Sequence, residues 1–207
     1  YEIVFGDWRS DVCSSDLKDN YNFYECKKNN NNWSEPEELS DINKYLGATT
    51  PKIAPVYNYD ASEIYFEATV NENKDIFYSK RTNTGWSEPQ KLNNNINTEL
   101  NEGDPCISAD NNTIYFIRYL DKKNDEYGTI FTAKRINNQW DSVTQIIEPI
   151  TLGFERSPRI LVDNKTLVFS SIRDKQSTFS LYVSKNLYDD AWLLPKPIGK
   201  FSKDNDL

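Results

Sequence analysis

The residues that could do chemistry are few, and their types exclude most reactions. The 207-residue chain contains no His, which excludes a Ser-His-Asp triad, a Cys-His pair and His-ligated zinc. Its cysteines, Cys13, Cys26 and Cys106, are far apart and show no metal-ligand spacing. No Gly-x-Ser-x-Gly sequence is present to form the nucleophile elbow of a serine hydrolase. We therefore expect no catalytic residue, no metal site and no cofactor in this chain.

Carboxylates are the remaining candidates for catalysis, because a glycosidase needs a pair of Asp or Glu side chains beside the scissile bond. The segment 108–113 (Ser-Ala-Asp-Asn-Asn-Thr) resembles the Asp-box of sialidases. However, it is followed by Ile114 and Tyr115 instead of Thr and Trp. A tight hairpin turn explains the same segment, because Asp and Asn adopt left-handed backbone conformations and bond their own backbone.

Composition narrows the classes of partner. The formal net charge of −8 gives no basic stripe and disfavours contact with nucleic-acid phosphates. No apolar run reaches the length of a membrane span. We expect no nucleic-acid partner and no membrane span in this chain.

The elements that position these residues are repeated. Four Trp residues lie 53, 54 and 52 positions apart, at Trp33, Trp86, Trp140 and Trp192. Trp-Ser-Glu-Pro occurs at 33–36 and again at 86–89, and Pro195 also lies three residues after its Trp. A unit of about 53 residues is therefore present in several copies.

A second signature precedes each Trp. A Pro is followed five residues later by Asp and eleven residues later by Phe, and this occurs three times. The three sets are Pro55, Asp60 and Phe66; Pro105, Asp110 and Phe116; and Pro158, Asp163 and Phe169. Short apolar segments ending in Lys80, Lys134 and Lys185 follow, with 22–27 as a degraded version in the first copy.

Each unit is predicted to form four short strands, which in the second copy are 52–57, 63–68, 75–80 and 86–92. The second strand is a continuous apolar run, such as 64–66 or 114–117, which indicates a sheet covered on both faces. The fourth strand contains Pro36, Pro89 or Pro195. Because Pro cannot donate to a ladder, the fourth strand is predicted to be an edge.

These motifs resemble the WD40-like repeat of TolB-type β-propellers, over roughly residues 18–199. The Trp-Ser-Glu-Pro sequence, with 96–98 and 101–105 behind it, looks like the version common in secreted and envelope proteins of Bacteroidetes. That version often accompanies a peptidoglycan-binding OmpA-type domain. The chain departs from the pattern where Gly follows the turn Asp, since Ala61, Asn111 and Asn164 stand there. The departure puts the type of turn in question.

The resemblance implies an all-β fold, a β-propeller domain with about 3.75 four-stranded blades. We expect a partial first blade at 1–46 and further blades at 47–98, 99–152 and 153–199, with 200–207 leading to a next blade. Residues 2–5 are the expected second strand of the first blade. The chain is interpreted as an arc of a propeller with six to eight blades, whose signal peptide is not in this fragment.

Residues 6–17 interrupt the repeat. The second-strand Phe precedes its Trp by 20 to 24 residues in complete copies, but Phe5 precedes Trp33 by 28. One frame of a common sequencing adapter translates to Asp-Trp-Ser-Ser-Asp-Val-Cys-Ser-Ser-Asp-Leu, which differs from 7–17 only at Arg9. We interpret 6–17 as a translated adapter; the alternative is a natural loop insertion.

The resemblance favours a non-catalytic scaffold that binds a protein or a cell-envelope component, in the periplasm, at the outer membrane or outside the cell. The alternatives are the propeller domain of a prolyl-oligopeptidase-like peptidase or a glycosidase, with catalytic residues outside this chain, and a structural spacer. Charged segments precede two innermost strands and are predicted to lie at the channel mouth, where they could bind a partner. They contain Glu102, Asp104, Glu155 and Arg156. The other reading is that Asp104 and Ser157 bond the nearby backbone.

Overall fold

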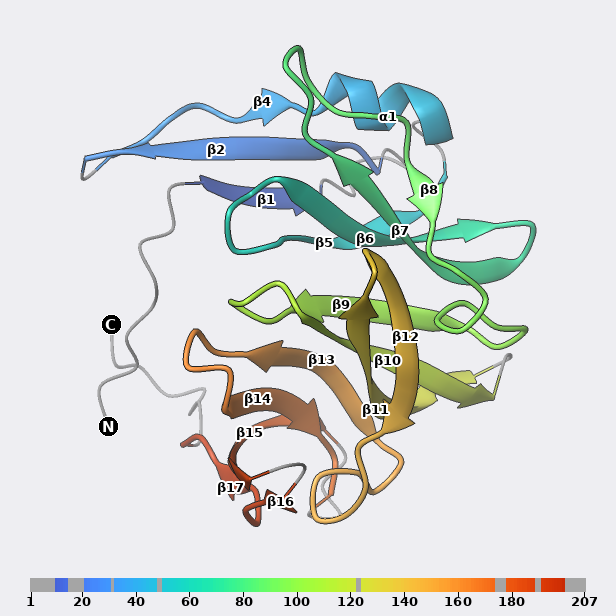
Figure 1. Cartoon of the computed structure of the whole chain (residues 1–207), viewed down its shortest axis with the longest axis vertical. Coiled ribbons are helices and arrows are strands. Elements are labelled where there is room, and N and C mark those ends of the chain that lie inside the picture. Colours follow the sequence, from blue (N-terminus) through green and yellow to red (C-terminus); the bar gives the residue numbers. More distant parts are fainter. Residues whose placement is uncertain are drawn as a thin grey trace.

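The computed structural model describes residues 10–14, 21–30, 32–47, 50–121, 124–173, 178–188 and 191–199. They form four antiparallel sheets that follow one another along the chain and stack face to face (Figure 1). Sheet 1 contains β1 (Ser10–Ser14), β2 (Phe23–Asn29), β3 (Asn32–Trp33) and β4 (Glu37–Glu38). Sheet 2 contains β5 (Lys52–Tyr57), β6 (Glu63–Val70), β7 (Asn73–Lys80) and β8 (Gln90–Lys91). Sheet 3 contains β9 (Glu102–Ile107), β10 (Thr113–Asp121), β11 (Asn124–Ile136) and β12 (Gln139–Gln145). Sheet 4 contains β13 (Glu155–Ile160), β14 (Thr166–Ser171), β15 (Ser180–Tyr188), β16 (Ala191–Trp192) and β17 (Lys196–Pro197).

The strands of sheet 2 test the sequence prediction directly. β5 has the predicted bounds, and β6 and β7 are each two residues longer than predicted. The predicted fourth strand, 86–92, is reduced to the two residues of β8 and an isolated bridge between Arg81 and Trp86. Pro89 interrupts it, since Pro has no N–H for the ladder.

The same explanation holds across the copies. Pro36 lies between β3 and β4, and Pro195 lies between β16 and β17, so both fourth strands are split. In sheet 3 Val143 stands in place of the Pro, and β12 is continuous over seven residues. The fourth strand pairs with the third in every sheet, at its edge as predicted.

The one helix within the described residues is α1 (Ser40–Leu46), which connects sheet 1 to sheet 2 along the chain and was not predicted. It buries Ile42 and Asn43. The Asn43 amide accepts from the Phe23 N–H at 2.9 Å and donates to its carbonyl at 3.2 Å. Asn97 does the same for Ile76 in the next copy, at 2.8 and 2.9 Å. The links between copies therefore clamp the third strand of the sheet before them.

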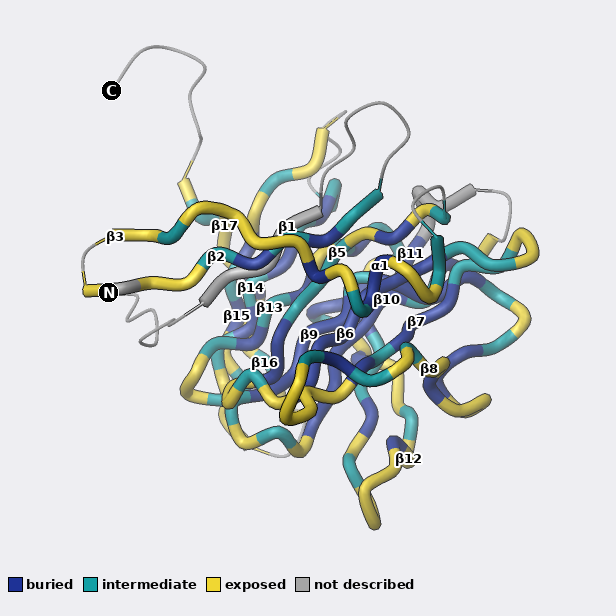
Figure 2. The backbone as a smooth tube through the Cα atoms, turned by 90° about the horizontal axis from the view of Figure 1, so that it is seen from above, coloured by how far each residue is buried: buried dark blue, intermediate teal, exposed yellow. Residues whose placement is uncertain are grey.

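Three apolar clusters fill the spaces between the four sheets. One contains Phe23 and Phe66, the second Tyr65 and Phe116, and the third Tyr115 and Phe169. Neighbouring residues of β6 and of β10 belong to different clusters, so both faces of sheets 2 and 3 are covered. This confirms the prediction from the continuous apolar runs, and Figure 2 shows the buried strands in the middle of the molecule.

The first strands β5, β9 and β13 lie side by side, and each contains the same irregularity. The pairing register shifts next to the Pro in all three. The residue before that Pro has a positive φ: 52° at Ala54, 51° at Asp104 and 49° at Ser157. Each first strand therefore bulges at the predicted Pro anchor, which redirects the backbone N–H of the preceding residue.

The hairpin turns form at the predicted Asp residues. The Asp60 carboxylate accepts from the Ser62 N–H at 3.0 Å, and Asp110 and Asp163 make equivalent bonds. Ala61, Asn111 and Asn164, the residues that stand in place of Gly, have φ values of 54–60°. Asn tolerates this left-handed conformation.

Those two Asn residues also connect neighbouring sheets. The side-chain Oδ1 of Asn111 accepts from the Tyr59 N–H of sheet 2 at 3.3 Å. The side-chain Oδ1 of Asn164 accepts from the Ala109 N–H of sheet 3 at 2.8 Å. A Gly at either position would lose this bond between sheets.

The prediction for the first copy falls partly outside the described residues, which include neither the expected second strand, 2–5, nor 200–207. β1, inside the segment interpreted as an adapter, pairs with β2. Its backbone bonds do not depend on the origin of the sequence, so the adapter interpretation stays a prediction. The described strands of the other copies fall within 47–98, 99–152 and 153–199, although the exact domain boundaries remain predictions.

Candidate functional site

Glu102 was predicted to lie in a loop at the channel mouth, but it begins β9 and is fully buried. Its carboxylate accepts from the Thr98 N–H at 3.0 Å and the Thr98 hydroxyl at 2.6 Å. The Arg118 Nε donates to it at 2.8 Å. Burial raises the pKa of Glu102, opposed by these hydrogen bonds. Glu102 thus ties the link between copies to β10.

Glu155 repeats this arrangement at the start of β13, where it is also fully buried. It accepts from the Leu152 and Gly153 N–H groups at 2.9 and 3.0 Å and lies 3.3 Å from the Arg173 guanidinium. Burial raises its pKa as well. In sheet 2 the equivalent residue is Lys52, whose ammonium donates to the Gly47 carbonyl at 2.7 Å.

Asp104 and Arg156, the other two predicted residues, are partly exposed on the neighbouring strands β9 and β13. Asp104 Oδ2 accepts from the Ser157 N–H at 2.9 Å, a bond to the backbone of the neighbouring strand β13 and not to its own turn. The Arg156 guanidinium lies over the rings of Tyr119 and Phe179, at 5.5 and 5.4 Å from their centroids.

Two residues that the sequence analysis missed complete this group. Glu67 of β6 is 2% exposed, and its Oε2 accepts from the Asp104 N–H at 3.0 Å. Lys74 Nζ is 3.4 Å from Glu67 Oε1 and 5.2 Å from the centre of the Tyr119 ring. We call Glu67, Lys74, Asp104, Arg156 and Ser157 the inner cluster.

The electrostatics of the inner cluster are dominated by burial. Burial raises the pKa of Glu67; Lys74 opposes this and the Asp104 carboxylate adds to it. Gly103 makes the close approach possible, because a Cβ there would lie 2.0 Å from Glu67 Oε2. A charged residue directly after the apolar run 64–66 was the only signal of this site in the sequence.

Glu67 and Asp104 are the paired carboxylates of the inner cluster, but their contacts do not suit acid–base catalysis. Glu67 is enclosed, and its two oxygens face Lys74 and the Asp104 N–H. Within the described ranges, no group of His, Cys, Asp and Glu could hold a metal ion. Cys26 and Cys106 are free thiols, and burial raises the pKa of Cys106.

A crevice of about 220 Å³ lies between the outer parts of sheets 2 and 3. Arg135 lines it, donating to Glu63 at 2.6 Å and to the Tyr65 hydroxyl at 2.7 Å, with its guanidinium 4.5 Å from the Trp140 ring centroid. Arg81 lies over Trp86 in the same way and pairs with Glu25 of sheet 1 at 3.0 Å. The repeated Trp therefore belongs to an Arg–Glu link between neighbouring sheets.

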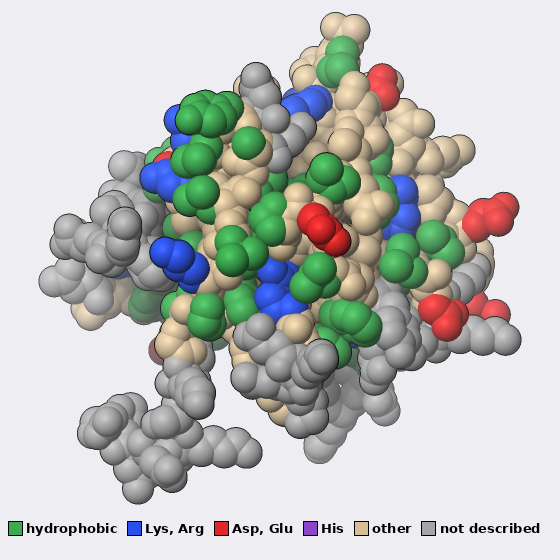
Figure 3. Space-filling view, turned by 90° about the horizontal axis from the view of Figure 1, so that it is seen from below, with side chains coloured by type: hydrophobic (Ala, Val, Ile, Leu, Met, Phe, Trp, Pro, Cys, Tyr) green, Lys and Arg blue, Asp and Glu red, His purple; other side chains and the backbone are tan. Residues whose placement is uncertain are grey.

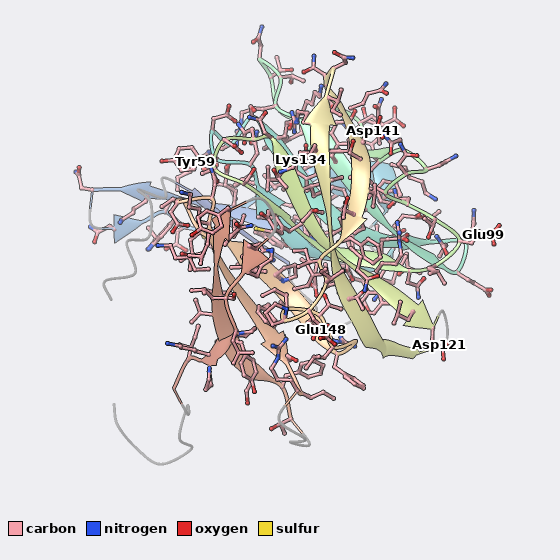
Figure 4. The ribbon with its side chains drawn as sticks, turned by 60° about the horizontal axis from the view of Figure 1, so that its bottom comes forward. Tyr59, Glu99, Asp121, Lys134, Asp141 and Glu148 are labelled. Carbon is pink, nitrogen blue, oxygen red and sulfur yellow. The ribbon has the colours of Figure 1, made fainter. Side chains whose placement is uncertain are left out.

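The strand ends form separate surfaces. Tyr59, Lys134 and Asp141 lie in the upper half of Figure 4, whereas Asp121 and Glu148 lie in the lower half. Asp121 is the last residue of β10, and Glu148 lies in the segment that joins sheet 3 to sheet 4. In the part of the chain that the structure describes, no helix is long and apolar enough to cross a bilayer.

Solved structures show the same arrangement of sheets. TolB from Acinetobacter baumannii aligns with 88% of this chain at 16% identity and a TM-score of 0.59. The fold is that of a β-propeller. An α-L-arabinofuranosidase from Podospora anserina aligns with 92% of the chain (16% identity, TM-score 0.54), and a prolyl endopeptidase aligns with 90% (14%, 0.52).

These similarities establish the fold alone. The chain spans 40% of the TolB chain, 64% of the arabinofuranosidase and 29% of the prolyl endopeptidase. No protein-family profile and no curated protein matches the sequence. The propeller fold and its TolB-like character agree with the sequence prediction, while the role of the propeller has to be argued from its own residues.

Proposed function

We propose that this chain is a non-catalytic β-propeller scaffold that binds a protein or a peptidoglycan-associated component of the cell envelope. The observation that carries the proposal is that two of the four predicted residues are buried and the other two are partly exposed and accessible to a partner. Glu102 and Glu155 are buried with intramolecular partners, whereas Asp104 and Arg156 remain partly exposed on adjacent first strands. In a TolB-like propeller such strands line the channel where partners dock.

The geometry of this pair suits recognition of a partner with complementary charges. Ser157, next to Arg156, bonds Asp104, so the acidic and basic groups belong to one continuous wall. The rings of Tyr119 and Phe179 hold the Arg156 guanidinium, which lowers the entropy cost of ordering it on binding. Fixed charges of opposite sign orient a partner and raise its association rate.

We propose a location in the periplasm, at the outer membrane or outside the cell, and a parent propeller of six to eight blades. The TolB-like fold and the envelope-type repeat motifs support the location. The larger parent is supported by the similarity to TolB, of which this chain spans 40%.

The test is binding of purified peptidoglycan sacculi by the full-length protein and two variants. Asp104→Asn keeps an acceptor oxygen for the Ser157 N–H, and Arg156→Gln removes the positive charge. We expect each to weaken binding at least tenfold while the urea midpoint stays unchanged. Glu99→Gln is the matched control, because Glu99 is exposed and outside the inner cluster.

Two results would contradict the proposal. If either variant lowers the unfolding midpoint and leaves the affinity of the folded fraction unchanged, the residue serves the fold. If the unchanged protein does not sediment with sacculi and captures no envelope protein in the same experiment, the structural-spacer alternative is favoured.

The second candidate is the propeller domain of a hydrolase whose catalytic residues lie outside this chain. The similarity to the arabinofuranosidase and the prolyl endopeptidase favours it. The full-length protein would then hydrolyse an α-L-arabinofuranoside or a prolyl peptide, and Glu67→Gln should leave the turnover number unchanged if that carboxylate is structural.

A further inference from the structure

The crevice of about 220 Å³ between sheets 2 and 3 is enclosed by two consecutive sheets of this chain. Neither sheet is the first or the last of the four, so blades added at either end of the stack would not fill it. The apolar side chains that gather on the sheet 4 side (Figure 3) are different, because a following blade of the proposed parent would cover them. The crevice is smaller than the pockets of roughly 300 Å³ or more that hold drug-sized ligands. It therefore suits a group the size of one sugar or one amino acid.

Side chains on one face of sheet 2 form the first wall of the crevice. Tyr65 pairs with Tyr78 across β6 and β7, and Glu63 pairs with Lys80. All four line the crevice and thus face sheet 3. The Tyr78 ring stacks on that of Tyr65 at 6.0 Å between centroids and is partly exposed. Tyr78 therefore gives the crevice a flat aromatic surface that a ligand can reach.

Sheet 3 supplies hydrogen-bond donors on the opposite wall. Arg135 uses Nη2 for its bonds to both Glu63 and the Tyr65 hydroxyl. Its buried Nε has no hydrogen-bond partner among the described residues. Asn138 of the β11–β12 turn and Gln139 at the start of β12 are exposed and line the crevice. Each amide carries two N–H donors and an acceptor oxygen, so these side chains can bond the oxygens of a ligand.

The charges of the crevice leave one cation uncommitted. The Lys80 side chain is 56% exposed, and its ammonium lies 3.9 Å from Glu63 Oε1, beyond hydrogen-bond distance. Glu63 instead bonds Arg135 at 2.6 Å, and Lys91, the third base of the lining, lies 2.5 Å from Asp75 Oδ2. These three bases and two acids sum to one net positive charge. An anion can therefore bind here although the net charge of the chain is −8.

The equivalent residues of sheet 3 do not repeat this combination. Thr132 stands where Tyr78 does in sheet 2. The ammonium of Lys134, which is equivalent to Lys80, donates to the Thr113 hydroxyl at 3.1 Å. Sheet 3 forms the same strands without an aromatic ring or an uncommitted ammonium at these places. The fold therefore does not require either feature in sheet 2.

We propose that this crevice binds a carboxylate carried by one sugar or amino-acid unit. The carboxylate would pair with the Lys80 ammonium through a charge-assisted hydrogen bond, which is stronger than one between neutral groups. The rest of the ligand would lie against the Tyr78 ring, and its other polar groups would meet the Asn138 and Gln139 amides. An aromatic surface with a few polar groups around it is the usual composition of a small-ligand site. The crevice lies outside the inner cluster, so this inference does not depend on the proposed scaffold function.

Isothermal titration calorimetry of the full-length protein tests the proposal with two carboxylate probes. Sodium glucuronate represents an acidic sugar and N-acetylalanine a terminal amino acid, with glucose and N-acetylalanine amide as their neutral counterparts. We expect a carboxylate probe to bind at least tenfold more tightly than its neutral counterpart, and to bind more weakly at high salt because Lys80 is exposed. The probe with the lower dissociation constant identifies the source of the carboxylate.

Variants place the binding in the crevice. Lys80→Gln should raise the dissociation constant at least tenfold at an unchanged urea midpoint, because a hydrogen bond to a charged group is lost. Tyr78→Thr, which copies Thr132, should raise it at least threefold in the folded fraction. Lys134→Gln is the matched control, since Lys134 has the same place in sheet 3 and does not line the crevice.

Three results would overturn the proposal. The first is that neither carboxylate probe binds, and the second is that the carboxylates and their neutral counterparts bind equally well. The third is an equal loss of affinity in Lys80→Gln and Lys134→Gln, which would mean that the probes respond to the charge of the whole chain and not to this crevice.

Discussion

The buried Glu102–Arg118 pair supports the strongest stability prediction, for Glu102→Ala. Glu102 is fully buried and Arg118 is 14% exposed, so the change leaves a largely buried guanidinium without its carboxylate. Breaking a buried pair in this way costs about 3–5 kcal/mol. The Thr98 N–H and hydroxyl also lose their acceptor.

The assay is urea unfolding at pH 7, followed by far-ultraviolet circular dichroism. With an m-value of about 2 kcal/mol/M, a loss of about 4 kcal/mol lowers the midpoint by roughly 2 M. Glu102→Gln should lose less, because it keeps an acceptor for Thr98. The double change Glu102→Lys with Arg118→Ala copies Lys52 and its partner Ala68 in sheet 2, and it should also lose less than Glu102→Ala.

The reasoning is refuted if Glu102→Ala lowers the free energy of unfolding by less than about 1 kcal/mol, the size of one ordinary hydrogen bond. Such a result would mean that water reaches Arg118 after the change. It would also show that the buried pair does not determine the stability of sheet 3.

Four further predictions concern the inner cluster, the links and the first copy. Gly103→Ala should destabilise the protein by about 1–3 kcal/mol because its Cβ meets the Glu67 carboxylate, and a second change of Glu67 to Ala should recover part of the loss in the same unfolding assay. Burial raises the pKa of Glu67 in the folded protein, so ionising Glu67 lowers the free energy of unfolding above the ordinary carboxyl range, and this penalty disappears as the pH falls. The free energy of unfolding of Glu67→Gln, relative to that of the unchanged protein, should therefore be more favourable at pH 7 than at pH 4. Equal differences at the two pH values would contradict this. Asn97→Ala should cost about 1–3 kcal/mol, with the fastest gain in amide exchange at Ile76, because a buried N–H and carbonyl lose their partner. Amplification of the locus from source DNA should give a shorter segment than 6–17, whereas recovery of the same twelve codons with unrelated adapters would show that the segment is natural.

The parts of the fold that sequence could predict are those that repeat. Trp86, Trp140 and Pro105 mark positions where every copy needs the same backbone or contact, so their spacing predicted the repeat, and the apolar runs between them predicted the strands. The predicted bounds of β5 are those observed. The continuous runs that contain Phe66 and Phe116 correctly predicted that both faces are covered.

The site was harder to predict because burial depends on what lies across the sheet. Glu102 and Asp104 are both acidic and two residues apart, yet one is enclosed against Arg118 and the other is partly exposed. Their side chains differ in surroundings because of the bulge at Asp104, and a bulge has no signature in composition. Glu67 belongs to one sheet only, so repetition could not reveal it. The helix α1 was missed for the same reason, since the other copies have short turns there.

The bonds between sheets have a consequence for how such a chain can change length. Tyr59 bonds Asn111, Ala109 bonds Asn164 and Asp104 bonds Ser157, at separations of 52, 55 and 53 residues. Every partner is thus found one repeat away. Deleting or duplicating a whole repeat by recombination would bring equivalent residues together again, and the new neighbours would already fit. Inserting or deleting part of a repeat would break these bonds, so the length of such propeller sequences is expected to change by whole repeats, one sheet at a time.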